Sequence, residues 1–188
     1  MIIRIKYFHE QSWHSPILKP IGLRQKTLIV NGQNSLTGPM AQTAYSYRAD
    51  KTVPDFDDSR PIIVFDGHCV LCSAWIGFVL KHDHQKQFRF IVAQSELGEA
   101  LYAHYGLKSE DYDTNLLVES GHVREKSDGT LAMFSALGWP WKLMSIFRII
   151  PTPLRDSIYS LIARNRIGWF GAQEICYLPT PDVKARFL

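Results

Sequence analysis

Two cysteines three residues apart, Cys69 and Cys72, are the side chains of this chain best suited to carry out chemistry. An apolar run at residues 62–65 and a polar lead-in at residues 66–68 precede them. Residues three apart on a helix share a face, so the two sulfurs can approach and form a disulfide. The order predicts a buried strand, a tight turn and two cysteines in the first turn of a helix. Thiol-disulfide exchange needs this arrangement.

Each residue of this motif has an expected role. The positive end of the helix should lower the pKa of Cys69, which we expect to be the exposed nucleophile. Cys72, one turn deeper, should resolve the mixed disulfide, and Asp66 could accept its proton. Asp66 could instead only cap the helix or anchor the turn. Gly67 and His68 should tune the site, since an imidazolium at His68 would help Cys69 to ionise, although an exposed ring would do little.

Two other interpretations of the cysteines remain. A structural zinc site needs four ligands, and the nearest further candidates, His82 and His84, would splay apart on a helix. The third cysteine of the chain, Cys176, lies far along the sequence, where a buried apolar role competes with that of a third redox thiol. Cys69 and Cys72 could also be inert core residues, but their polar lead-in argues against that interpretation.

The whole chain has the composition of a globular protein. It has 188 residues, 46% of them apolar, and a net charge of +3, which fit one domain with an appendage. No apolar run reaches the ~18 residues of a membrane span, and the N-terminus lacks the apolar core of a signal peptide. We therefore expect a cytoplasmic protein with a redox-active cysteine pair. The basic segment 148–166 is interleaved with apolar residues, which favours a solvated helix face over nucleic-acid binding.

The chain divides into three parts of different character. Residues 1–59 are polar and weakly periodic, so we expect a poorly structured extension or linker, with a short strand at 26–30 at most. Residues 60–178 should form the domain and residues 179–188 a tail. Residues 1–39 look dispensable, and we expect the native protein to begin at Met40.

The pattern after residue 60 predicts an α/β fold. A strand, a helix, a strand, a helix, a hairpin around Ser120-Gly121 and a further helix follow in this order. That is the order of a thioredoxin-like mixed sheet flanked by helices, here with additional C-terminal helices. The expected strands are 62–65, 88–92, 115–119 and 122–126, and the expected helices are 69–82, 96–105, 127–137 (capped by Ser127 or Asp128), 141–149 and 154–166.

The motif Asp66-Gly67-His68-Cys69-Val70-Leu71-Cys72 resembles the signature of the DCC family of thiol-disulfide oxidoreductases, named for the acid and the two cysteines. The resemblance covers roughly residues 60–178 and implies a thioredoxin-like fold and a protein-disulfide reductase type of activity. Thioredoxins carry a cis-proline before the third strand, but residues 112–115 contain no proline. We therefore expect a different substrate groove. Further matching segments are 88–95, the stretch from Ser127, 155–159, 163–166 and 169–171, closing at Cys176.

We thus expect an enzyme that passes electrons between a protein or small-molecule disulfide and another thiol system, without a bound cofactor. A non-catalytic redox sensor or adaptor is the main alternative. A haloacid-dehalogenase-like phosphatase would need a second aspartate where His68 stands. Near the C-terminus, we expect Arg164 and Arg166 to serve the helix dipole. We expect the aromatic residues there to lie in the core or an interface: Trp139, Trp141, Trp169 and Phe170.

Overall fold

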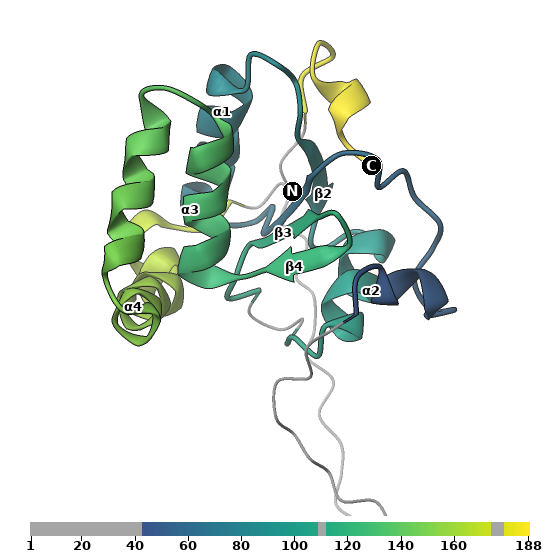
Figure 1. Cartoon of the computed structure of the whole chain (residues 1–188). Coiled ribbons are helices and arrows are strands. Elements are labelled where there is room, and N and C mark those ends of the chain that lie inside the picture. The colour runs from purple at the N-terminus through teal and green to yellow at the C-terminus, as the bar shows by residue number, and fades with distance from the viewer. Residues whose placement is uncertain (1–42, 109–111, 174–178) are drawn as a thin grey trace, which may run out of the picture. The chain divides into compact units, whose positions relative to one another are not determined.

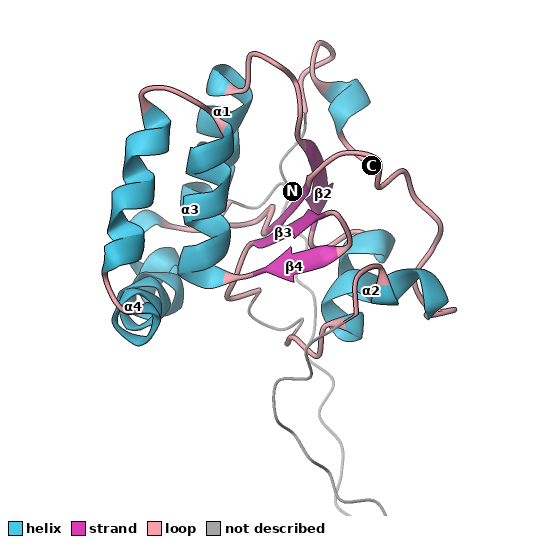
Figure 2. Ribbon diagram, viewed as in Figure 1, coloured by secondary structure: helices cyan, strands magenta, loops and turns pink. Residues whose placement is uncertain are grey.

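A mixed four-stranded sheet forms the centre of the domain. The structure, a computed structural model, describes residues 43–108, 112–173 and 179–188. The strand order is β2-β1-β3-β4, with β1 parallel to β2 and antiparallel to β3, which pairs antiparallel with β4 (Figures 1 and 2). This confirms the predicted thioredoxin-like α/β class. The strands are β1 (Ile62–Phe65), β2 (Arg89–Val92), β3 (Leu116–Glu119) and β4 (His122–Arg124).

Helices cover both faces of this sheet. Two of them differ from the sequence prediction: residues 141–149 form a 3-10 helix, and the last long helix continues to Phe170 instead of ending at Arg166. The other predicted helices are present with ends shifted by at most two residues. The α-helices are α1 (Val70–His82), α2 (Glu96–His104), α3 (Lys126–Ala136) and α4 (Thr152–Phe170), and the 3-10 helices are η1 (Ser46–Ala49), η2 (Trp141–Ile149) and η3 (Lys184–Arg186).

The central strand β1 is buried on both faces, as expected for a strand between two helical layers. Its alternating side chains enter two separate apolar clusters. Ile62 and Val64 pack with residues of α2 and η1, whereas Ile63 and Phe65 pack with residues of α1 and α3. Since α4 contacts both α1 and α3, it lies on the second side of the sheet. The first turn after β1 is therefore held between rigid elements.

The hairpin between β3 and β4 turns at the predicted residues. Ser120 and Gly121 both have positive φ angles, 50° and 78°, as a type I′ turn requires. The predicted cap of the next helix is wrong. Glu125 occupies the N-cap of α3 without a side-chain hydrogen bond, and the Ser127 hydroxyl instead donates to the carboxylate of Asp156 in α4.

Both ends of the described domain pack more closely than the sequence suggested. We expected a poorly structured segment up to residue 59, but Tyr47 and Val53 are buried against the α2 side of the sheet. The expected tail also contacts the sheet, because the Leu188 N–H donates to the carbonyl of Phe90 in β2. Arg186 of the tail pairs with the buried carboxylate of Asp83, which follows α1. The proposed strand at 26–30, Met40 and Cys176 lie outside the described residues.

The C-terminal helices leave several apolar side chains on the surface. Trp139, Trp169 and Phe170 are exposed, so they do not belong to the core, whereas Trp141 is half-buried against Phe78 and His82. Their predicted role in an interface stays a prediction. Within the described part of the chain, no helix is long and apolar enough to cross a membrane.

Candidate active site around Cys69 and Cys72

The cysteine pair lies where β1 passes into α1. Asp66 directly follows the strand, and Cys69 has an extended backbone, with φ of −84° and ψ of 121°. Cys69 is therefore the N-cap of α1, whereas we had expected it in the first turn of the helix. Its Sγ accepts a hydrogen bond from the backbone N–H of Cys72 at 3.2 Å. A sulfur in this position replaces the usual oxygen cap and faces the positive end of the helix.

Cys69 is fully buried, which contradicts its expected exposure. The chain leaves α4 at Gly171, whose φ of 88° turns it back toward the motif. Ala172 then forms an antiparallel bridge with Cys69, and the Gln173 N–H donates to the carbonyl of His68 at 2.8 Å. The Gln173 side chain also donates to the carbonyl of Gly67 and to the hydroxyl of Ser73, at 2.9 and 2.6 Å. Residues 171–173, the covering segment, thus lie against Cys69.

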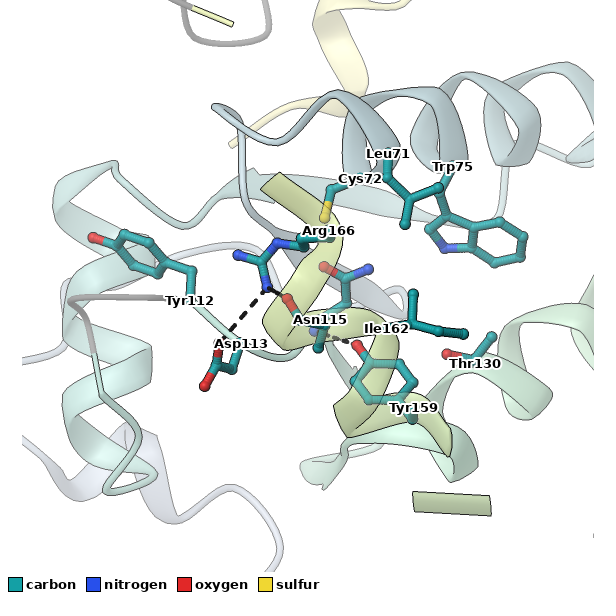
Figure 3. Close-up of a pocket in the computed structure, with 11 residues that line it drawn as sticks. Leu71, Cys72, Trp75, Tyr112, Asp113, Asn115, Thr130, Tyr159, Ile162 and Arg166 are labelled. Atoms are coloured by element: carbon teal, nitrogen blue, oxygen red, sulfur yellow. Dashed lines mark hydrogen bonds and ion pairs between the residues drawn. The ribbon is translucent and has the colours of Figure 1, made fainter. Parts of the chain in front are cut away.

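Cys72 contacts a pocket on the other side of the motif. The side chains that line this pocket come from α1, the loop before β3, α3 and α4, and enclose about 220 Å³. Figure 3 shows the Cys72 sulfur directed from α1 toward Arg166 and Asn115. Leu71, Trp75 and Ile162 form apolar walls. Although only 7% of Cys72 is exposed, its sulfur borders open space.

The two cysteines have pKa values that are shifted in opposite directions. The pKa of Cys69 is lowered to about 6, first because the Cys72 thiol donates a hydrogen bond to it, then through the Cys72 N–H and the charge of Arg166. The pKa of Cys72 is raised, because that same hydrogen bond and burial both favour its protonated form. The pair therefore holds a thiolate on Cys69 and a proton on Cys72 at neutral pH. The two cysteines are not joined by a disulfide in this structure.

A buried ion pair lies beside the cysteines. Arg166 Nη2 contacts Asp66 Oδ2 at 2.7 Å, and the two residues are 5% and 4% exposed. This contradicts the expectation that Arg166 only complements a helix dipole, because α4 continues for another turn and directs Arg166 inward. Arg164 is exposed, and its proposed role at the dipole stays a prediction. Taking one partner from a buried pair leaves an uncompensated charge, so the pair fixes α4 to the motif.

Gln94 joins β2 to the turn that carries the motif. Its side-chain amide donates to Asp66 Oδ1 at 2.6 Å and its carbonyl accepts from the Gly67 N–H at 3.0 Å. The His68 N–H also donates to Asp66 Oδ1. The predicted tuning residues thus contact the site through their backbones, and the His68 side chain is exposed. Asp66 lies at the centre of these contacts, consistent with the expected anchoring of the turn.

The loop before β3 borders the pocket, at the place where thioredoxins carry their cis-proline. Tyr159 of α4 accepts a hydrogen bond from the Asn115 N–H at 3.2 Å, and the buried Tyr102 hydroxyl donates to the carbonyl of Thr114. Asp113 lies 3.9 Å from Arg166 at the exposed side of the loop. Side chains of two helices therefore hold this loop beside Cys72.

The described residues contain no group of three or more His, Cys, Asp or Glu that could hold a metal ion. His82, a ligand in the zinc interpretation, hydrogen-bonds the carbonyl of Phe78 and packs against Trp141.

Sequence reasoning missed three supporting residues. Gln94 follows β2, and parallel strands end at the same edge of a sheet, so its nearness to Asp66 could have been inferred. Gln173 gave no local signal, because its contacts depend on the turn at Gly171. Arg166 lies inside α4 and is buried, whereas the sequence prediction ended the helix at this residue. Only a prediction that continued the helix to Phe170 could have placed the Arg166 side chain on its inward face.

Comparison with known proteins identifies relatives over most of the described domain. A sequence model of the DCC1-like thiol-disulfide oxidoreductase family matches residues 63–172. The chain is 39% identical to the uncharacterized protein YuxK of Bacillus subtilis over 127 residues, 68% of this chain and 93% of that protein. It is 34% identical to a chloroplastic DCC family protein of Arabidopsis thaliana over 123 residues, 65% of this chain and 72% of that protein. No solved structure gives a significant match.

Proposed function

The chain belongs to the family of DCC1-like thiol-disulfide oxidoreductases, and we propose that it exchanges thiols and disulfides through Cys69 and Cys72. The observation that carries this proposal is the shared proton of the pair. Cys69 caps α1, receives two hydrogen bonds from Cys72 and has a pKa lowered to about 6. A thiolate at neutral pH is the reactive species of such exchange.

The overall reaction converts a substrate disulfide and the reduced pair into one substrate thiol, one substrate thiolate and the Cys69–Cys72 disulfide. Two electrons pass from the pair to the substrate. Because only Cys72 carries a proton at the start, one proton leaves the pair in each turnover. Asp66 is the carboxylate proposed to relay that proton, because it lies close enough for its charge to act on both cysteines. Another thiol system would return the electrons.

The first experiment measures whether the pair closes and opens reversibly. The full chain is equilibrated in a series of glutathione buffers, its thiols are trapped by alkylation, and its intact mass is recorded. We expect Cys69 and Cys72 to titrate as one two-electron couple between about −270 and −120 mV. The Cys69→Ser and Cys72→Ser variants are matched controls that cannot close. Two thiols that stay free across the whole series would overturn the proposal.

A redox sensor is a second candidate function, and the covering segment favours it. Residues 171–173 lie against Cys69, so a change in its oxidation state would change the contact that this segment makes. An enzyme and a sensor differ in turnover. Reduction of insulin by excess dithiothreitol, with and without a catalytic amount of the protein, separates them: acceleration supports the enzyme, whereas a reversible couple without acceleration supports the sensor.

A further inference from the structure

We propose that substrates bind in the pocket beside Cys72 and form their mixed disulfide with Cys72, and that they carry the reacting sulfur on a compact apolar group. This inference rests on the proposed function and reverses the order of the two cysteines that their sequence positions suggest. Cys69 becomes the inner partner that makes and breaks the bond to Cys72.

Access to the two sulfurs is the first argument. Cys69 is 0% exposed and lies against residues 171–173, which four hydrogen bonds from Val70 and Gln173 hold in place. Cys72 borders the pocket, and its sulfur is directed toward the space between α1 and α4 (Figure 3). Thiol-disulfide exchange requires the entering sulfur to approach in line with the bond that breaks, so accessibility selects which sulfur is attacked. The geometry selects Cys72.

The chemistry of the leaving sulfur is the second argument. When a substrate thiolate attacks Cys72 of the oxidised pair, Cys69 departs as the thiolate. A thiol with a lower pKa leaves faster. Cys72 has no thiol proton to donate at this step, but the hydrogen bond from the Cys72 N–H and the charge of Arg166 still lower the pKa of Cys69. The sulfur that is hardest to reach is thus the better leaving group, and the accessible sulfur is the better target.

The reducing direction follows the same path in reverse. The Cys72 proton passes along the hydrogen bond to Cys69, and the Cys72 thiolate attacks RS–SR′. This forms Cys72–S–SR and releases R′S⁻, which takes up the proton of Cys69. The Cys69 thiolate then attacks the Cys72 sulfur, forms the Cys69–Cys72 disulfide and releases RS⁻. Two electrons pass from the pair to the substrate, and the products are RS⁻ and R′SH.

The pocket indicates the class of substrate. Its volume of about 220 Å³ exceeds the ~150 Å³ of an apolar protein cavity that binds benzene, so it can accept a ring or one large side chain. Leu71, Trp75 and Ile162 provide apolar contacts, and the charge of Arg166 is paired with Asp66. The sulfur can belong to a small apolar thiol or to a protein cysteine beside an apolar side chain. Highly charged disulfides should fit poorly.

The test uses single-cysteine variants of the full chain in a Cys176→Ser background. Cys69→Ser leaves Cys72 as the reactive thiol, and Cys72→Ser leaves Cys69. The probe is 2,2′-dithiodipyridine, a compact uncharged aromatic disulfide whose released thiopyridone is coloured. We expect Cys72 to react about tenfold faster than Cys69 with this probe. Because thiopyridone is the better leaving group, any thiol prefers this probe to glutathione disulfide, and the preference of Cys72 in the folded chain should exceed that of the same variant unfolded in urea by about tenfold. Disulfides of peptides with a cysteine beside phenylalanine are compared with the small probe, which distinguishes a protein source from a small molecule. Peptides with a cysteine beside glutamate test whether a charged neighbour slows the reaction.

A pocket-filling variant tests the binding site itself. Ala163→Met places a longer side chain in the pocket, whereas Leu161→Met changes an exposed residue of the same helix. Only Ala163→Met should slow the reaction of Cys72 with the aromatic probe. In the wild-type chain, oxidised protein is mixed with benzyl mercaptan and quenched with acid, and fragment-ion mass spectrometry assigns the mixed disulfide, so the test does not depend on the folding of a variant.

The outcomes separate this inference from the proposed function. A mixed disulfide on Cys72 supports the inference. A mixed disulfide on Cys69, or equal rates for A163M and L161M, overturns it and leaves the dithiol function standing. Failure of the pair to close in glutathione buffers overturns the proposed function, and the inference with it.

Discussion

Cys69 and Cys72 stand one helical turn apart and both feel the charges of Asp66 and Arg166, yet they differ in protonation and in access to a pocket. Cys69 lies at the helix N-cap under residues 171–173, accepts hydrogen bonds and holds a thiolate. Cys72 lies inside the helix, keeps its proton and borders an apolar pocket. The comparison shows that low pKa and accessibility, which are often assigned to one cysteine, are divided here between two.

The difference between the two environments has a single structural origin. Helix α4 packs against α1, places Arg166 beside Asp66 and supplies one wall of the pocket, and the chain after α4 then turns over Cys69. Helix α4 thus lines the pocket beside Cys72 and leads into residues 171–173, which lie against Cys69. Substitutions in α4 should therefore change the difference between the two cysteines most strongly.

The largest effect is expected from Arg166→Met, which removes the support shared by both cysteines. The charge of Asp66 would be left buried without its partner, so the free energy of unfolding should fall by about 3–5 kcal/mol. Urea unfolding at neutral pH measures this change. Arg164→Met, on the exposed side of the same helix, should stay within about 0.5 kcal/mol of the wild type. Equal losses in the two variants would show that the ion pair does not anchor α4.

The next effect concerns the thiolate. Replacing Cys72 with alanine removes the hydrogen bond that lowers the pKa of Cys69 most, so this pKa should rise from about 6 toward the ~8.5 of a free cysteine. In the wild type, thiolate absorbance should appear as the pH rises through about 6; in the variant, it should appear at higher pH. Val70→Ala, in the same turn, is the control. An unchanged titration in Cys72→Ala would contradict the shared proton.

A smaller effect is expected from Gln173→Ala, which weakens the cover over Cys69. The variant loses the bonds to Gly67 and Ser73, each worth about 0.5–1.5 kcal/mol. Alkylation of Cys69, measured in a Cys72→Ser, Cys176→Ser background, should become about fivefold faster or more. Gln87→Ala removes a similar amide from a distant contact to Ala136 and should leave the rate unchanged. No acceleration would mean that residues 171–173 do not limit access.

The smallest effect is expected from His68→Ala. The exposed ring lies in water, where salt screens its charge, and the backbone contacts of this residue would remain. The pKa of Cys69 should change by less than about 0.3 units. A larger change, measured by the same thiolate titration, would restore His68 as the tuning residue that the sequence suggested.

Local patterns in the sequence were sufficient for the elements and their order. The apolar residues of β1, the paired turn residues Ser120 and Gly121 and the spacing of the cysteines each act within a few residues, so they predict a strand, a hairpin and a helix start. Boundaries that depend on packing were less predictable. The 3-10 helix η2 packs against α3, and nothing in its local sequence distinguishes it from an α-helix. Helix α4 continues to Phe170 and ends at Gly171, whose positive φ is a local stop signal that the sequence prediction overlooked.

The sequence by itself determined the reactive groups and the family: two thiols three residues apart, an acid after a buried strand, and the motif that they form. Only the tertiary structure decided how access and charge are divided between the two thiols. The burial of Cys69, the pocket at Cys72 and the pairing of Asp66 with Arg166 all join residues about one hundred positions apart. Accessibility and charge depend on which distant segments pack together, and the spacing within a motif carries no information about them.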